Sequence, residues 1–196
     1  MRRRTFDVLA SVAGLVLAIV LAAAGGLLVW GHNFADSQVS TQLSAQKIVF
    51  PTRTNPEFKA LPPADAAAMG QYAGQQMTTG AQAKVYADNF IAFHLSKMGG
   101  TYSQLSAQSI AQPNNAKLAA LVNTVFKGTT LRGMLLNAYA FWQMGQIALW
   151  AAIVSFAGAA LLLILSALGL IHYRRTPATT ELLPARHTEN IPATAS

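Results

Sequence analysis

The chain contains no cysteine among its 196 residues. Disulfide bonds, thiolate metal sites, a thiol nucleophile and a lipid-modified cysteine are therefore excluded. Charged residues are also scarce, at 11% of the chain, whereas soluble domains average about a quarter. Strand-forming patterns are nearly absent outside residues 48–50. Because 53% of the residues are hydrophobic, the composition is typical of a helical chain with long apolar segments.

Nucleic-acid binding is not indicated, although the formal net charge is +7. Arginines at positions 2–4 precede one apolar run, and Arg174 and Arg175 follow another. The eight basic residues between the runs are scattered, and they form no stripe with interleaved aromatic side chains. We therefore expect no nucleic-acid partner.

Two uncharged apolar runs cover residues 8–30 and 147–171. Each exceeds the ~20 residues needed to cross a hydrocarbon core. The first run could also be a signal peptide cleaved after Ala22-Ala23-Ala24, but it is longer than the usual 7–15-residue signal core. We favour two uncleaved transmembrane helices.

The flanking arginines predict the topology of the chain. Positively charged flanks stay on the cytoplasmic side, so the short basic head at 1–7 and the tail at 172–196 are expected in the cytoplasm. The segment 31–146 is then extracytoplasmic, and the chain is a multi-pass plasma-membrane protein. The tail is rich in Thr, Pro and Ala and is expected to be disordered.

Small residues recur every fourth position in both predicted spans. In lipid, small side chains let helices approach closely, so this stripe predicts docking of the first span on the second span or on a neighbouring copy. Abundant Ala and Gly alone would give the same pattern. The predicted helix-packing residues are Ala10, Gly14, Ala18, Ala22, Gly26, Ala151, Ser155 and Ala159.

The segment between the spans is predicted to be a small helical domain. Four prolines make residues 48–63 an extended arm. Thr79 and Thr101 each stand three residues before a glutamine, which is the spacing of a capping box. Gly128 is expected to end the helix that follows Asn114-Asn115, and Thr129 or Thr130 to begin the helix of the second span. The predicted fold class is therefore an all-α membrane protein with two transmembrane helices.

Two groups of side chains are the best candidates for ligand or partner contacts. One group lies on an external helix, where core packing is the competing and preferred interpretation; it comprises Tyr86, Phe90, Phe93 and His94. The other group is polar and precedes the second span; it comprises Arg132, Asn137 and Gln143. Arg132 is expected to pair with an external acid or a lipid phosphate.

Four segments resemble a group of actinobacterial two-span membrane proteins of unknown function. They are QLSAQKIVFP (42–51), TTGAQAKVYADNFIAFHL (78–95), GGTYSQLSAQ (99–108) and FKGTTLRGMLLNAYAFW (126–142). Members of this group often carry a transferred label of aromatic ring-opening dioxygenase. The resemblance implies no catalytic residues, since none are established for the group.

The dioxygenase label predicts two histidines and a carboxylate on iron. Between the spans the only histidines are His32 and His94, and neither has a second histidine at H-x-x-x-H spacing. No nucleophile elbow, P-loop or dinucleotide fingerprint appears either. We therefore expect the label to be wrong and the chain to be non-enzymatic, with no metal and no cofactor.

The leading functional hypothesis is an accessory or scaffolding subunit of a cell-envelope membrane complex, with a membrane-protein partner or a homo-oligomeric state. An oligomeric channel or transport element is one alternative, and an extracytoplasmic lipid or ligand sensor is another.

Overall fold

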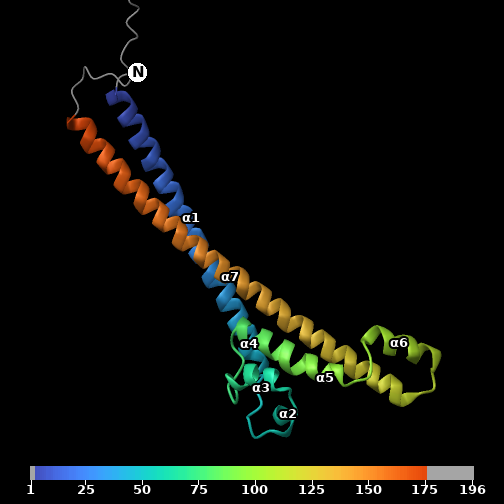
Figure 1. The fold of residues 1–196 in the computed structure, drawn as a ribbon. Coiled ribbons are helices and arrows are strands. Elements are labelled where there is room, and N and C mark those ends of the chain that lie inside the picture. Colours follow the sequence, from blue (N-terminus) through green and yellow to red (C-terminus); the bar gives the residue numbers. More distant parts are fainter. Residues whose placement is uncertain (1–2, 176–196) are drawn as a thin grey trace, which may run out of the picture. The chain divides into compact units, whose positions relative to one another are not determined.

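A computed structural model describes residues 3–175 (Figure 1). The first two residues of the predicted basic head and the tail from residue 176 lie outside the described residues. Every named element in the described part is a helix, and α1 and α7 are long and apolar, which confirms the all-helical prediction. The elements are α1 (Arg3–Gln46), α2 (Pro56–Lys59), α3 (Pro63–Gly70), α4 (Gly80–Val85), the π-helix η1 (Tyr86–Ile91), α5 (Ala92–Ser96), α6 (Tyr102–Ala111) and α7 (Ala116–Arg175).

The described residues divide into two compact units. The helix-pair unit comprises residues 3–27 of α1 and 151–175 of α7, and the cap unit comprises Leu28–Trp150. Residues 3–7 of the predicted basic head are helical, since α1 begins at Arg3.

The helix-pair unit is held by small side chains packed directly against one another. A Cβ atom added to Gly14 would overlap the Ser166 hydroxyl, and one added to Gly169 would overlap the Ser11 hydroxyl. The Ser155 hydroxyl donates a hydrogen bond of 2.9 Å to the Leu21 carbonyl. These reciprocal contacts show that α1 and α7 run antiparallel here, at a separation that only small residues allow.

The contact face follows a period of 3.5 residues rather than the predicted period of four. A step of four residues advances about 400° around a helix with 3.6 residues per turn, so a four-residue stripe drifts by about 40° per step. Alternating steps of three and four keep one face toward the partner helix. The inward positions on α1 are Ser11, Gly14, Ala18, Leu21 and Gly25.

The predicted packing residues therefore separate into two sets. Gly14, Ala18, Ser155 and Ala159 lie between the two helices, where Ala18 and Ala159 are almost fully buried. The other four residues of the predicted stripes are exposed: Ala10, Ala22, Gly26 and Ala151. Docking of this exposed set on a neighbouring copy remains a prediction.

In the cap unit, the end of α1 and the α4–η1–α5 segment both pack on α7. The His32 ring donates from Nδ1 to the Gly145 carbonyl at 3.0 Å. Gly80 lies against Trp142, and a Cβ atom added to Gly80 would be 2.7 Å from Trp142 Cγ. Further along, a Cβ atom added to Gly128 would be 2.8 Å from Leu95 Cδ2. The α4–η1–α5 segment therefore runs antiparallel to α7.

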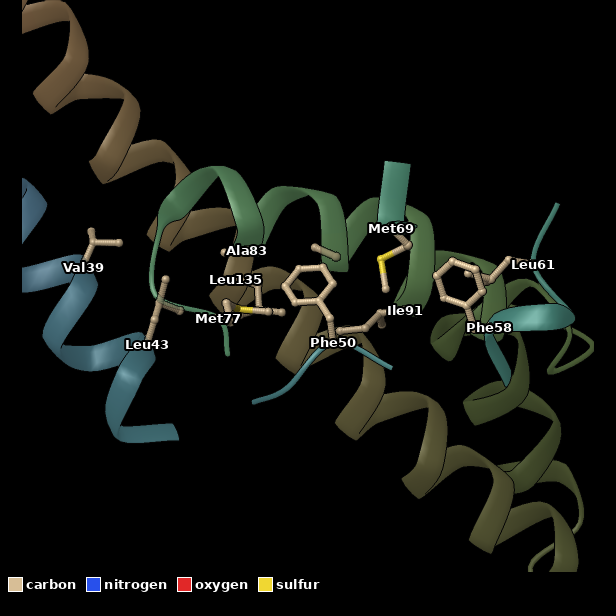
Figure 2. Packing of buried hydrophobic residues seen from close by; sticks show 11 residues of the cluster. Val39, Leu43, Phe50, Phe58, Leu61, Met69, Met77, Ala83, Ile91 and Leu135 are labelled. Atoms are coloured by element: carbon tan, nitrogen blue, oxygen red, sulfur yellow. The ribbon is translucent and has the colours of Figure 1, made fainter. Parts of the chain in front are cut away.

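The hydrophobic core of the cap unit takes side chains from α1, α2, α3, α4, η1 and α7 and from the connecting segments (Figure 2). Phe50 lies at the centre of this core and is 1% exposed. The centroid of its ring lies 5.3 Å from the ring centroid of Tyr72 and 5.3 Å from that of Tyr86. The buried cluster contains Val39, Leu43, Phe50, Phe58, Leu61, Met69, Met77, Ala83, Ala87, Ile91 and Leu135.

The arm at 48–63 is extended only in part. Asn55 accepts a hydrogen bond from the Glu57 amide and starts the single-turn helix α2, in which Pro56 takes the first helical position. Proline suits that position because its missing N–H needs no partner there. Val49 forms an antiparallel bridge to Gln76, which places Phe50 over the core.

Gly128 does not end a helix, contrary to the sequence-based expectation, because α7 continues through residues 128–130. A helix-interior glycine costs about 1 kcal/mol relative to alanine. Here the missing side chain lets Leu95 of α5 approach the α7 backbone, and this packing offsets the cost. The capping predictions are confirmed: Thr79 and Thr101 each form a complete capping box, with Gln82 and Gln104 respectively.

Candidate functional site

A charged cluster joins η1 to α7 in the cap unit. Asp88 accepts a hydrogen bond of 2.9 Å from Arg132 Nη2 and one of 2.5 Å from Lys84 Nζ. Arg132 Nε also donates to the Ala87 carbonyl at 3.2 Å. The sequence predicted an external acid or a lipid phosphate as the partner of Arg132, and within the described residues the structure supplies the acid.

The cluster shifts the pKa of two of its members. Partial burial alone would raise the pKa of Asp88, but the hydrogen bonds from Lys84 and Arg132, with their positive charges, lower it below the ordinary value of 3.8. The hydrogen bond to Asp88 and its negative charge raise the pKa of Lys84. Asp88 and Lys84 therefore keep their charges at neutral pH.

Arg132→Gln is expected to lower the free energy of unfolding by about 1 kcal/mol at pH 7, because partly exposed ion pairs contribute little. The folded-state pKa of Asp88 is lowered, so its contribution is present above pH 3.8 and is lost as the pH falls toward the folded-state pKa. Denaturation of the detergent-solubilised protein across this range would measure the difference. Lys127→Gln, an exposed change on the same helix, is the control. A difference of equal size at neutral and strongly acidic pH would contradict the assignment.

The predicted aromatic residues form a ladder along η1 and α5. The Tyr86 and Phe90 ring centroids are 4.9 Å apart, and those of Phe90 and His94 are 4.4 Å apart. Tyr86, Phe90 and Phe93 all pack against the buried cluster. Burial raises the pKa of the Tyr86 hydroxyl, with a smaller contribution from Glu57. This placement supports core packing as the role of the ladder.

Both described histidines between the long apolar segments use Nδ1 in hydrogen bonds to backbone carbonyls. His94 Nδ1 lies 2.8 Å from the Phe90 oxygen, and His32 bonds Gly145. Because a carbonyl oxygen only accepts, Nδ1 carries the proton in each ring. Residues 3–175 contain no group of three His, Cys, Asp or Glu side chains placed to hold a metal ion.

An open groove of about 500 Å³ lies between α1 and α7 in the cap unit. This volume falls in the range of about 300–1,000 Å³ typical of ligand sites. Its apolar lining consists of Phe34, Ala35, Val39, Leu43, Met134, Leu135, Ala138 and Phe141. Its polar lining consists entirely of side-chain amides, from Gln38, Gln42, Gln46 and Asn137.

The groove exposes large apolar side chains. Phe34, Met134 and Phe141 are 55%, 61% and 62% exposed. The three glutamines are four residues apart and all exposed, so they follow one edge of the groove. No charged residue lines it. This combination of exposed apolar side chains and an amide edge makes the groove the candidate functional site.

The three polar residues that were predicted as contact candidates before the second span lie in three different surroundings. Arg132 belongs to the charged cluster, Asn137 lines the groove, and Gln143 is half-buried on α7. The glutamine edge was not predicted from the sequence. The pattern that indicates it is the four-residue spacing of Gln38, Gln42 and Gln46.

No protein-family model matches the chain, and no similar chain was found among the curated proteins or the solved structures. The resemblance to the actinobacterial two-span group and the non-enzymatic assignment therefore stay predictions.

Proposed function

We propose that the chain is an integral membrane protein with two transmembrane helices, and that it acts as a non-enzymatic accessory or scaffolding subunit of a cell-envelope complex. The observation that carries this proposal is the exposed apolar surface of α1 and α7. Only 11% of the most apolar 18-residue window in each helix is buried. An apolar helix of a soluble core would be largely buried, whereas a lipid-facing helix keeps its apolar side chains outward.

The ends of the helices support an orientation with both termini in the cytoplasm. Arg174 and Arg175 end α7, and arginines at positions 2–4 stand at the start of the chain. Trp30 and Trp150, at the opposite ends of the apolar runs, are 66% and 67% exposed. Indole rings favour the membrane interface, so the cap unit is assigned to the extracytoplasmic side.

Cysteine labelling can test this topology without interference, because the chain has no native cysteine. Ser103→Cys, an exposed position in the cap unit, is expected to react with a membrane-impermeant maleimide in intact cells. Ser196→Cys is expected to react only after the cells are opened. Equal labelling of both variants in intact cells, or protection of Ser103→Cys, would overturn the assigned topology.

The accessory role is supported by the exposed apolar side chains of the groove in the cap unit. Purification from native membranes in mild detergent is expected to recover the chain with a second membrane protein or with further copies of itself. Recovery as a lone monomer would contradict the role. Lipid or another small ligand bound in the groove, identified by mass spectrometry, would replace the subunit role by that of a sensor.

The channel alternative receives less support. Its pore would need polar side chains facing a central axis. The hydroxyls of Ser11, Ser155 and Ser166, the polar groups of the predicted spans, lie between α1 and α7 of one copy. They are thus occupied by helix pairing within the chain.

A further inference from the structure

A second open cavity lies in the cap unit, between α5, α7 and the segment that begins α6. Its volume is about 640 Å³, which is also within the range typical of ligand sites. We name it the arginine cavity, because Arg132 is the one charged side chain among the described residues that line it. Five further residues of the lining carry hydroxyl groups: Ser96, Thr101, Tyr102, Ser103 and Thr129.

One edge of the Arg132 guanidinium is fixed against η1. Nε donates to the Ala87 carbonyl at 3.2 Å, and Nη2 donates to the Asp88 carboxylate at 2.9 Å. A guanidinium carries five N–H groups in a planar fork, so two N–H groups on Nη1 and one on Nη2 are left. These three form no hydrogen bond within residues 3–175. η1 therefore holds the side chain in place, while the edge formed by Nη1 and Nη2 stays available to a ligand.

Several hydroxyl groups of the arginine cavity are also available. Ser96 donates its hydroxyl to a backbone carbonyl at 2.7 Å, and Thr101 uses its own in the capping box of α6. The hydroxyls of Tyr102, Ser103 and Thr129 form no hydrogen bond within the described part of the chain. The cavity therefore offers unused donors from both α6 and α7.

The charge of the surroundings favours an anion. Asp88 balances one of the two cationic side chains that contact it, Lys84 and Arg132, so this cluster keeps a net positive charge. No aspartate or glutamate among the described residues lines the arginine cavity. A neutral ligand would leave the positive charge without a partner, whereas an anion would pair with the charge and accept from the free N–H groups.

We propose that the arginine cavity binds a phosphate group, which accepts hydrogen bonds from the free edge of Arg132 and from the hydroxyl of Thr129. Thr129 stands three positions before Arg132 on α7, so the two side chains share one face of that helix. An arginine fork binds two phosphate oxygens at once, and a tetrahedral phosphate has further oxygens for hydroxyl donors. A free phosphate ester and a phospholipid headgroup both carry this group. Such binding goes beyond the accessory role and does not depend on the membrane topology.

The first arm of the test measures binding of inorganic phosphate to the purified full chain in an uncharged detergent, by titration calorimetry at constant ionic strength. Thr129→Glu is expected to weaken the binding about tenfold or more, because the introduced carboxylate reaches the free edge of Arg132 and repels the anion. Thr130→Glu is the matched control, since it adds the same charge at the next position, outside the cavity lining. Both threonines are exposed, so neither change threatens folding.

The second arm examines a lipid as the source of the phosphate. The same three chains are placed in mixed micelles that contain either phosphatidic acid or diacylglycerol, which lacks the phosphate. A ligand that binds the folded state raises the midpoint of thermal denaturation. If the site takes a headgroup, phosphatidic acid is expected to raise the midpoint of the unaltered chain and of Thr130→Glu, but not that of Thr129→Glu.

The two arms together decide the proposal. A loss confined to Thr129→Glu in the first arm alone assigns the site to soluble phosphate compounds, and such a loss in the second arm assigns it to a lipid headgroup. Equal losses in Thr129→Glu and Thr130→Glu, or no binding in either arm, would overturn the proposal. The labelling of Ser103→Cys and the co-purification experiment test the proposed function separately, so a negative result here leaves that function standing.

Discussion

Phe50→Ala is expected to lower the free energy of unfolding of the cap unit by about 3–5 kcal/mol, the usual range for truncating a buried phenylalanine. Phe50 is 1% exposed, and its ring contacts both Tyr72 and Tyr86. Removing it leaves a cavity between the arm and η1 (Figure 2). This cost is a large fraction of the stability of an ordinary domain, so the cap unit is expected to become protease-sensitive at 37 °C.

The neighbouring residue provides the control for this experiment. Val49 is 54% exposed, so Val49→Ala is expected to change the free energy by less than about 0.5 kcal/mol. Thermal denaturation of the full chain in detergent, with limited proteolysis of the cap unit, would measure both variants. Equal losses in the two variants would contradict the assignment of this stability to burial of the Phe50 ring.

Gly14→Leu is expected to weaken the pairing of α1 and α7 in the helix-pair unit by about 2 kcal/mol or more, the scale of overpacking a close contact. Even a Cβ atom at Gly14 would overlap the Ser166 hydroxyl, and a leucine adds three further carbons. The helices would have to separate, and close contact is the main source of helix association in lipid. The midpoint of unfolding by sodium dodecyl sulfate in mixed micelles would report the loss.

Gly26→Leu is the matched control, because nothing lies within 4 Å of a Cβ atom added at Gly26. Both changes add the same side chain to the same helix, so differences in helix propensity cancel. The midpoint for Gly26→Leu is expected to stay near that of the unaltered chain. Similar losses in the two variants would mean that the face assigned by the 3.5-residue period is wrong.

The sequence alone determined those features that depend on local chemistry. The two long apolar helices follow from uncharged runs, and the capping boxes at Thr79 and Thr101 follow from hydroxyl and amide spacing. The lysine–aspartate pair at positions 84 and 88 follows from i,i+4 geometry. Each of these depends on residues less than two helical turns apart or on composition, so no knowledge of distant contacts was needed.

Only the tertiary structure decided which faces meet. The four-residue stripe identified Gly14 and Ala18 but also four exposed positions, because the partner helix selects a 3.5-residue period. Gly128 continues a helix because Leu95, thirty-three positions away, packs against it. The groove needs α1 and α7 side by side, almost a hundred residues apart in the chain. Long-range packing overrides local preference wherever its free energy exceeds the ~1 kcal/mol that propensity contributes.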